Sequence, residues 1–267
     1  MNLKSISKKI RKTILNTIYT AKTGHIGGSL SCVDILISLY FGKHLKFDPK
    51  KPKLKDRDRL IVSKGHATAA YYSVLAHLGF IKISELQTYC RNNTRLATHL
   101  SGSVPGVEFD TGSLGHGLGI ACGLAYSAKI DKKKYKVFAL ISDGELYEGS
   151  VWEALLFASH YKLNNLIIIV DRNNQIVMDK TEDCIKLNPL EKKFKSFGYK
   201  TFQINGHSFK DLDRVFKKIM KKKNSPPTVV IANTIKGKGI SFMEKNVKWH
   251  HAVPKKEEFE KALKELG

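Results

Sequence analysis

Two short polar segments follow strand-like stretches and contain residues that could bind a metal ion. Asp143-Gly144 follows the apolar stretch Lys136–Ser142, and Asn173 follows the next one, Asn165–Asp171. In a parallel α/β sheet, ligands bind where the carboxyl ends of the strands meet. Carboxylate and amide oxygens suit Mg²⁺ or Ca²⁺, and Mg²⁺ commonly bridges to phosphate oxygens. The pair therefore predicts a divalent-metal site, with two ordinary turns as the alternative, because Asp-Gly and Asn-Asn are common turn formers.

Several of the ten histidines lie in glycine-rich or loop segments. A small neighbour lets an imidazole approach a ligand, where it can donate to a sugar hydroxyl or exchange a proton near pH 7. The histidines in such settings are His25, His66, His99, His116, His250 and His251. Those without such a setting, which we expect to be ordinary core or surface residues, are His44, His77, His160 and His207.

The elements that would position these residues alternate between strand and helix. Four stretches are apolar on both faces, as buried parallel strands are: Arg59–Lys64, Lys136–Ser142, Asn165–Asp171 and Thr228–Thr234. The helix-like stretches are Met1–Lys22, Gly65–Gly79, Ser113–Lys129, Ser150–Leu163 and Phe209–Lys221. This alternation predicts the α/β class, with a mostly parallel sheet and helices on both faces.

The connectors do not divide the chain. Lys50–Arg59 and Lys221–Pro227 are charged, contain proline and are typical of surface loops. We therefore expect a single domain over residues 1–267.

Composition excludes several classes of protein. The chain has 267 residues, 42% of them hydrophobic, and a net charge of +22. The excess is mostly lysine and shows neither aromatic interleaving nor a nucleic-acid-reading motif, so nucleic-acid binding from charge alone is a weak alternative. No apolar run approaches the ~20 residues that span a bilayer. The four cysteines include no C-x-x-C pair, which favours a reducing cytoplasm over a zinc site or disulfides.

Taken in order, these segments resemble the amino-terminal half of transketolases, from Gly24 to Pro254. The matching segments are Gly24-His25, Ser63–His66, Pro105–Glu108, Thr111–Gly115, Ser142–Gly144 with Glu148-Gly149, Asn173, Gly237–Gly239 and Trp249–His251. Three positions depart from the usual family residue: Ser142 replaces Gly, Ser113 replaces Pro and His251 replaces Gly. A dinucleotide site is a poor alternative, because Ile120 stands where its fingerprint requires Gly.

The resemblance implies thiamine diphosphate with Mg²⁺ or Ca²⁺ as cofactors. The implied metal ligands are Asp143, Asn173 and the backbone carbonyl of Gln175. The implied cofactor contacts are His66, Gly144, Gly112, Ser113, Leu114, Asn173 and His250. The implied roles in proton transfer and substrate binding fall to His25, His250 and His99. Glu148 matches a glutamate that couples paired sites at a subunit interface, and an ordinary acid near a helix start is the alternative.

The resemblance also implies a missing part. A complete transketolase continues with a pyrimidine-binding domain and a carboxyl-terminal domain, whereas Lys255–Gly267 predicts only a short charged helix. We therefore expect the N-terminal subunit of a split transketolase. It would be inactive alone and would pair with a C-terminal subunit, as a heterotetramer, to transfer a two-carbon ketol unit from a ketose phosphate to an aldose phosphate. A 1-deoxyxylulose-5-phosphate synthase-like half, or a transketolase for an unusual sugar, is the alternative.

Overall fold

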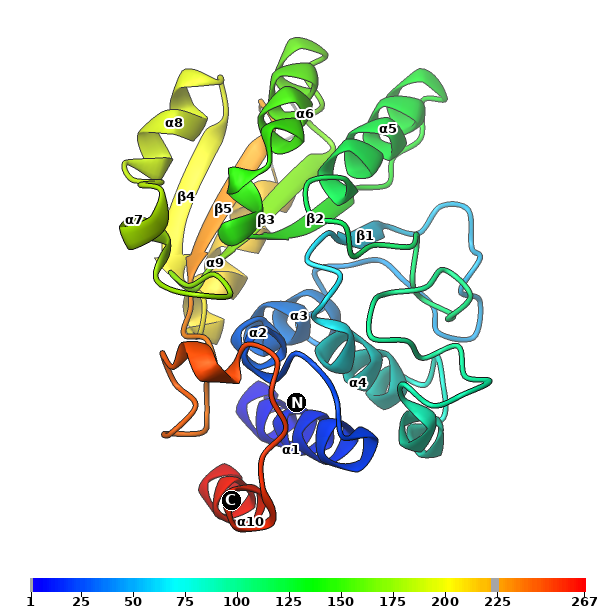
Figure 1. The fold of residues 1–267 in the computed structure, drawn as a ribbon. Helices are drawn as coiled ribbons and strands as arrows, with labels where there is room; N and C mark the ends of the chain where they lie inside the picture. Colours follow the sequence, from blue (N-terminus) through cyan, green and yellow to red (C-terminus); the bar gives the residue numbers. More distant parts are fainter. Residues whose placement is uncertain (1, 222–225) are drawn as a thin grey trace.

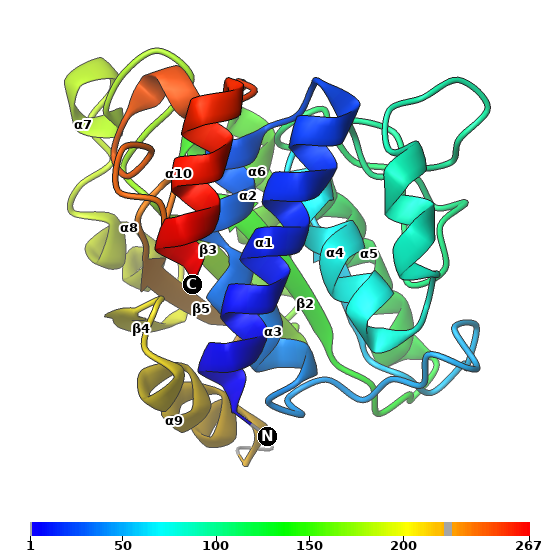
Figure 2. The same cartoon turned by 90° about the horizontal axis from the view of Figure 1, so that it is seen from below.

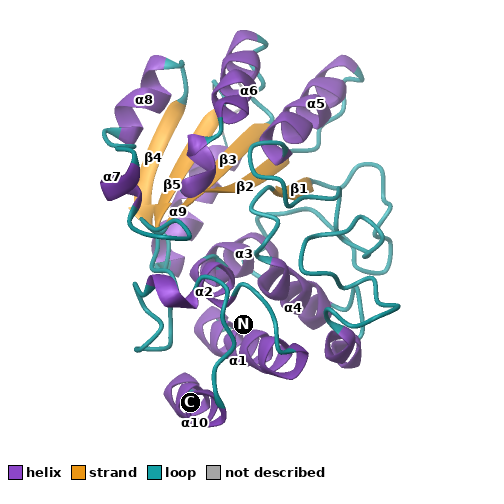
Figure 3. Cartoon of the chain, in the orientation of Figure 1, coloured by secondary structure: helices purple, strands orange, loops and turns teal. Residues whose placement is uncertain are grey.

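The computed structural model describes residues 2–221 and 226–267. Its centre is a five-stranded sheet in the order β1-β2-β3-β5-β4, in which every neighbouring pair is parallel (Figures 1 and 3). The strands are β1 (Arg59–Val62), β2 (Val137–Ser142), β3 (Leu166–Arg172), β4 (Lys200–Asn205) and β5 (Thr228–Asn233). The predicted fold class is confirmed.

Ten α-helices and three 3₁₀ helices are assigned within the described residues. The α-helices are α1 (Leu3–Ala21), α2 (Ile26–Ser31), α3 (Val33–Tyr40), α4 (Thr68–Leu78), α5 (Gly117–Ile130), α6 (Gly149–His160), α7 (Thr181–Cys184), α8 (Leu190–Ser196), α9 (Phe209–Met220) and α10 (Lys256–Leu266). The 3₁₀ helices are η1 (Ile83–Thr88), η2 (Gly144–Tyr147) and η3 (Val247–Trp249). None of the described helices is both long and apolar enough to cross a membrane.

Helices cover both faces of the sheet (Figure 1). Successive residues of a strand point to opposite faces. Phe138 and Leu140 therefore pack into a core with α1–α4 and α9, while Ala139 and Ile141 pack into a second core with α5, α6 and α8. Figure 2 shows α10 alongside α1, where the rings of Tyr19 and Phe259 stack at 3.9 Å.

Strand register places the candidate polar segments at one edge. Ser142 at the end of β2 pairs with Asp171 near the end of β3. Arg172, the last residue of β3, pairs with Asn233 at the end of β5. The segments that follow β2, β3 and β5 therefore begin side by side.

The structure differs from the sequence-based prediction in a few elements. β4 was not predicted because it is an edge strand whose only buried residue is Ile204, so it lacks an apolar run. The short helices α2 and α3 were not predicted either, and all of their residues are buried. The helix predicted from Ser113 begins at Gly117, because the preceding residues form a loop. The predicted connector Lys221–Pro227 falls largely on residues 222–225, which lie outside the described residues.

Candidate functional site

The predicted metal-binding residues lie together at the carboxyl edge of the sheet. Asp143 follows β2 and its side chain is fully buried. Its Oδ1 accepts a hydrogen bond from the Gly144 N–H at 2.9 Å, and its Oδ2 accepts one from the Asn174 N–H at 2.6 Å. Asn173 Oδ1 accepts one from the Gln175 N–H at 3.1 Å. The segment after β3 thus folds around the Asp143 carboxylate, and the left-handed Asn174, at φ 63°, makes this turn.

Arg172, which sequence reasoning missed, ties this carboxylate to the next helix. Its guanidinium lies 3.3 Å from Asp143 Oδ2 and donates to Thr181 Oγ1 at 2.8 Å and to Glu182 Oε1 at 2.6 Å. Burial raises the pKa of Asp143 to about 6, and the positive charge of Arg172 acts in the opposite direction. Arg172 therefore favours the ionised form of Asp143, which is the form a metal ion requires.

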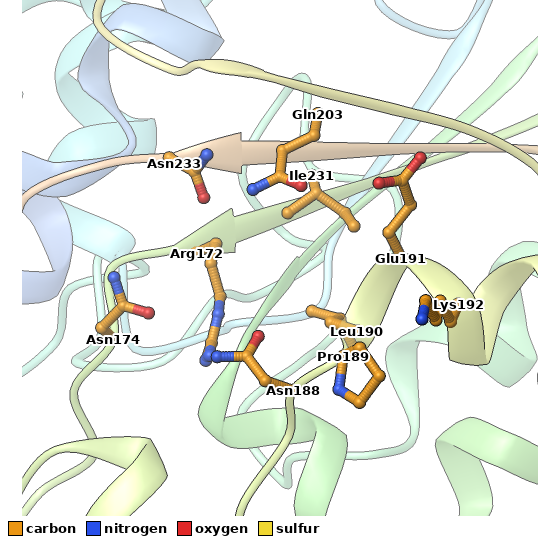
Figure 4. A pocket seen from close by; sticks show the side chains of 10 residues that line it. All are labelled: Arg172, Asn174, Asn188, Pro189, Leu190, Glu191, Lys192, Gln203, Ile231 and Asn233. Carbon is orange, nitrogen blue, oxygen red and sulfur yellow. The ribbon is translucent and has the colours of Figure 1, made fainter.

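Arg172 also borders a polar cavity of about 380 Å³ at the ends of β3, β5 and β4 (Figure 4). The carboxamides of Asn174, Asn188, Gln203 and Asn233 line this cavity. None of the predicted site residues lines it, so we do not assign the predicted chemistry there.

Glycines allow the other predicted segments to pack closely against each other. A side chain at Gly65 would overlap the backbone carbonyl of Thr111, and a Cβ at Gly112 would lie 2.7 Å from the His99 ring. The Gly115 N–H donates to Glu145 Oε1 at 2.9 Å. Glu145 is a buried carboxylate that sequence reasoning missed, although it lies two residues after Asp143. Through it, the glycine-rich loop is fixed to the start of η2.

Four histidines gather around His25, which precedes α2. The centroid of the His25 ring lies 5.4 Å from those of His66 and His250, 5.9 Å from that of His99 and 4.5 Å from that of His251. The structure thus brings together all the histidines predicted to contact cofactor or substrate, although they come from four separate parts of the sequence.

The histidine cluster has an unusual electrostatic environment. Burial, with the nearby cations, lowers the pKa of His25 to about 4 and that of His250 to about 3, and it lowers the pKa of His66 well below its usual value. One of these cations is Lys236, whose ammonium donates to His250 Nδ1 at 2.8 Å and to the Ile176 carbonyl at 2.8 Å. Burial therefore favours the neutral form of all three rings.

A second buried lysine, Lys64, lies close enough to the cluster to lower the pKa of its histidines. Lys64, with no exposed surface, pairs with the equally buried Asp171 and donates to the Gly28 carbonyl at 2.9 Å. Asp171 also accepts hydrogen bonds from Ser31, at 2.6 Å, and from Thr234. Sequence reasoning assigned no role to Lys64 or Lys236, although Lys64 belongs to the Ser63–His66 motif and Lys236 directly precedes the Gly237–Gly239 motif.

The glycine-rich loop borders an open cavity beside the histidines. This cavity, of about 590 Å³, is lined by His99, Thr111, Gly112, Ser113 and His116, among others. His116 is thus near the site, but its ring is not part of the cluster around His25.

The residues present fit a bound metal and an organic cofactor. The predicted ligand set is one carboxylate, one carboxamide and one backbone carbonyl, which is an all-oxygen set of the kind Mg²⁺ or Ca²⁺ prefers. Only one member of this set, Asp143, is acidic. The set is therefore compatible with the finding that the described residues contain no group of three or more His, Cys, Asp or Glu placed to hold a metal ion. His25 Nδ1 and Gln175 Oε1 are buried polar atoms with no hydrogen-bond partner, as expected of a site that receives a polar ligand.

Comparison with known proteins identifies the family. The model of the transketolase thiamine diphosphate binding domain matches residues 3–267. The chain belongs to the transketolase family. It is 42% identical over 261 residues to an apulose-4-phosphate transketolase subunit of Phocaeicola vulgatus and 46% identical over 257 residues to the corresponding subunit of Actinobacillus succinogenes, and it covers 92% of each. It is also 36% identical to the 6-deoxy-6-sulfo-D-fructose transketolase subunit SqwG of a Clostridium species, of which it covers 96%.

Transketolases that are longer chains match over less than half of their length. The crystal structure of the Campylobacter jejuni transketolase superposes with a TM-score of 0.94 at 31% identity, covering 100% of this chain and 43% of that one. Human transketolase is 35% identical, and 42% of its length is covered. These matches confirm that the chain is the N-terminal, thiamine-diphosphate-binding half of a transketolase-type transferase.

Glu148 and Ser113 occupy exposed positions in this transketolase half. Glu148 is the N-cap residue of α6, and its side chain packs against Gly115. Ser113 lines the open cavity, while Leu114 is partly buried beside it. Their predicted roles at a subunit interface and against the cofactor remain predictions.

Proposed function

We propose that this chain is the cofactor-binding subunit of a split transketolase. Such an enzyme transfers a two-carbon ketol unit from a ketose phosphate to an aldose phosphate, the chemistry of the pentose phosphate pathway. The observation that carries the proposal is that the Asp143–Asn173 segments and the histidine cluster lie together, because Lys236 contacts both the Ile176 carbonyl and His250 Nδ1. The chain also matches two apulose-4-phosphate transketolase subunits over 92% of their length.

The metal site would hold Mg²⁺ or Ca²⁺ through Asp143, Asn173 and the Gln175 carbonyl. Arg172 supports this role because it favours the charged form of Asp143 and orders the segment that carries the other two ligands. Gly144 and His66 would contact the diphosphate region, and Gly112, Ser113 and Leu114 would line the aminopyrimidine side, where backbone groups serve. His250 would contact the cofactor as well as the substrate.

Thiamine diphosphate, when bound, supplies the carbon nucleophile and the electron sink for breaking a bond beside a carbonyl. The chain's own contribution is positioning and proton movement. We propose that His25 and His250, whose ring centroids lie 5.4 Å apart, orient the substrate hydroxyls and exchange protons with them. Burial favours the neutral form of both rings, which is the form that can accept a hydrogen bond from a hydroxyl. His99, whose ring centroid lies 5.9 Å from that of His25, would orient the substrate by hydrogen bonding.

The rest of the active site would come from a separate C-terminal subunit, in a heterotetramer with two copies of each chain. We propose residues 1–267 as one diphosphate-binding domain, with Glu148 at a subunit interface and the assembly in the cytoplasm. The related subunits carry the names of transketolases for apulose 4-phosphate and for 6-deoxy-6-sulfo-D-fructose. A transketolase specialised for a sugar outside the pentose phosphates is therefore the second candidate, and it would use the same site.

The test is metal-dependent binding of thiamine diphosphate. We expect the cofactor with Mg²⁺ to stabilise the wild-type chain by about 2.7 kcal/mol when present at 100 times its dissociation constant. Asp143→Ala, which removes a metal ligand, should abolish this stabilisation, whereas Asp131→Ala, at the exposed end of α5, should retain it.

Two results would count against the proposal. One is equal stabilisation of the wild type and Asp143→Ala, and the other is salt-sensitive DNA binding without any response to thiamine diphosphate. Full two-carbon transfer by the purified chain alone would contradict the need for a partner subunit.

A further inference from the structure

A buried ionic network lies behind the candidate site, between α1 and α3. Asp34 of α3 accepts hydrogen bonds from Arg11, at 2.8 and 3.0 Å, and from Ser7, at 2.6 Å. Although burial alone would raise the pKa of Asp34, the hydrogen bonds from His207 and Arg11 hold it well below its usual range. Asp34 is therefore a fixed anion, and it can orient any donor that reaches it.

His207 extends this network to another part of the chain. Its Nε2 lies 2.9 Å from the backbone nitrogen of Ile235, and its Nδ1 lies 2.8 Å from Asp34 Oδ2. A backbone N–H can only donate, so Nε2 is the acceptor. Nδ1 then carries the proton and donates to Asp34, which fixes the tautomer and the orientation of the ring.

The segment that follows β5 is held at three points. His207 binds the Ile235 N–H, the Arg11 Nε–H donates to the Lys238 carbonyl at 2.9 Å, and the Gly237 N–H donates to the Gly27 carbonyl at 3.0 Å. Lys236 lies between these anchors. Its ammonium meets His250 Nδ1 and the Ile176 carbonyl.

We propose that His207 and Asp34 are positioning residues for Lys236. His207 fixes the backbone before Lys236 through the Ile235 N–H, and Asp34 orients both His207 and Arg11, which holds the Lys238 carbonyl after it. Lys236, which is 2% exposed, is thereby held with its ammonium against the His250 ring. Only hydrogen bonds within this chain support the proposal, so it can fail without affecting the assignment of the reaction.

The experiment compares the reactivity of Lys236 in variants of the full chain. Trace labelling with acetic anhydride, read by mass spectrometry, measures how often each amine becomes accessible. His207→Phe removes both hydrogen bonds of the ring. His44→Phe is the matched control, because His44 is also buried and lies 3.3 Å from an aspartate carboxylate, that of Asp213, but has no hydrogen bond to the segment after β5. Lys64 is the internal control, since it is fully buried near the site and held by other partners.

We expect His207→Phe to raise the labelling of Lys236 about ten-fold, the effect of losing one good hydrogen bond on local opening, with Lys64 unchanged. His44→Phe should change neither lysine. His207→Gln should restore most of the protection, because its carboxamide can still accept from the Ile235 N–H. The proposal fails if labelling of Lys236 stays at the wild-type rate in His207→Phe, or if Lys236 and Lys64 rise together, which would show general loosening. It also fails if His44→Phe exposes Lys236 equally.

Discussion

The buried pair of Lys64 and Asp171 offers a quantitative test of what holds the site together. Neither side chain has any exposed surface, and the pair joins the ends of β1 and β3 to α2. Lys64→Met keeps a similar length but leaves Asp171 with only the hydroxyl donors of Ser31 and Thr234. Removing one partner of a buried pair costs about 3–5 kcal/mol, because the remaining charge is buried without compensation. That is a large part of the roughly 5–15 kcal/mol that stabilises a typical protein.

Urea unfolding followed by circular dichroism measures this cost. With a slope of about 3 kcal/mol per molar urea, we expect the midpoint to fall by roughly 1 to 2 M. Lys217→Met is the control, because its pair with Asp213 is 64% and 43% exposed and should contribute less than about 1 kcal/mol. Adding Asp171→Asn to Lys64→Met should recover part of the loss, since the isolated charge is then gone. A loss below about 1 kcal/mol for Lys64→Met, or no recovery in the double variant, would refute this reasoning.

Two further predictions concern protonation and backbone packing. The ring protons of His25 and His250 should titrate by NMR with pKa midpoints near 4 and 3, because burial disfavours their charged forms. The unfolded chain takes up these protons below about pH 6.5, so stability should fall as the pH drops from there toward 4, and a midpoint near 6.5 for both rings would contradict the structure. Gly65→Ala should cost about 1–3 kcal/mol in urea unfolding, because the new methyl group overlaps the Thr111 backbone. Gly119→Ala, in a helix with open space around it, should be neutral or stabilise by up to about 1 kcal/mol, and equal effects of the two changes would count against the packing described here.

The central sheet could be predicted from sequence because its inner strands are apolar on both faces. β2, β3 and β5 are buried along nearly their whole length, so each appears as an uninterrupted apolar run. β4 could not be recognised in this way. As an edge strand it is mostly exposed or partly exposed, and its place in the sheet depends on pairing with β5 rather than on its own pattern.

The site residues also differ in whether sequence alone could identify them. Asp143, Asn173 and the glycine-flanked histidines lie in short motifs whose order matches a family, so sequence could nominate them, although their individual roles still await measurement. Arg172, Glu145 and His207 were not nominated. The bond that shows the role of each one joins it to a residue between 29 and 173 positions away in the chain. His207 illustrates the difficulty, since it reaches Asp34 across 173 positions. Nothing in its local sequence distinguishes it from a histidine on the surface.

The structure distinguishes two buried lysines from the other positive charges of the chain. The excess of 22 positive charges is a property of the whole composition and does not indicate a ligand. Two lysines differ from the many exposed ones because they are buried behind the histidine cluster, with exposed fractions of 0% for Lys64 and 2% for Lys236. Burial has the largest effect on the pKa of His250, and both lysines lower this pKa further, which favours the neutral ring. The charge of Lys64 is balanced by its buried ion pair with Asp171, whereas the ammonium of Lys236 donates to His250 Nδ1 and to the Ile176 carbonyl. The positive charge most relevant to an anionic ligand is therefore that of Lys236, which lies against the histidine cluster, and not the surface excess.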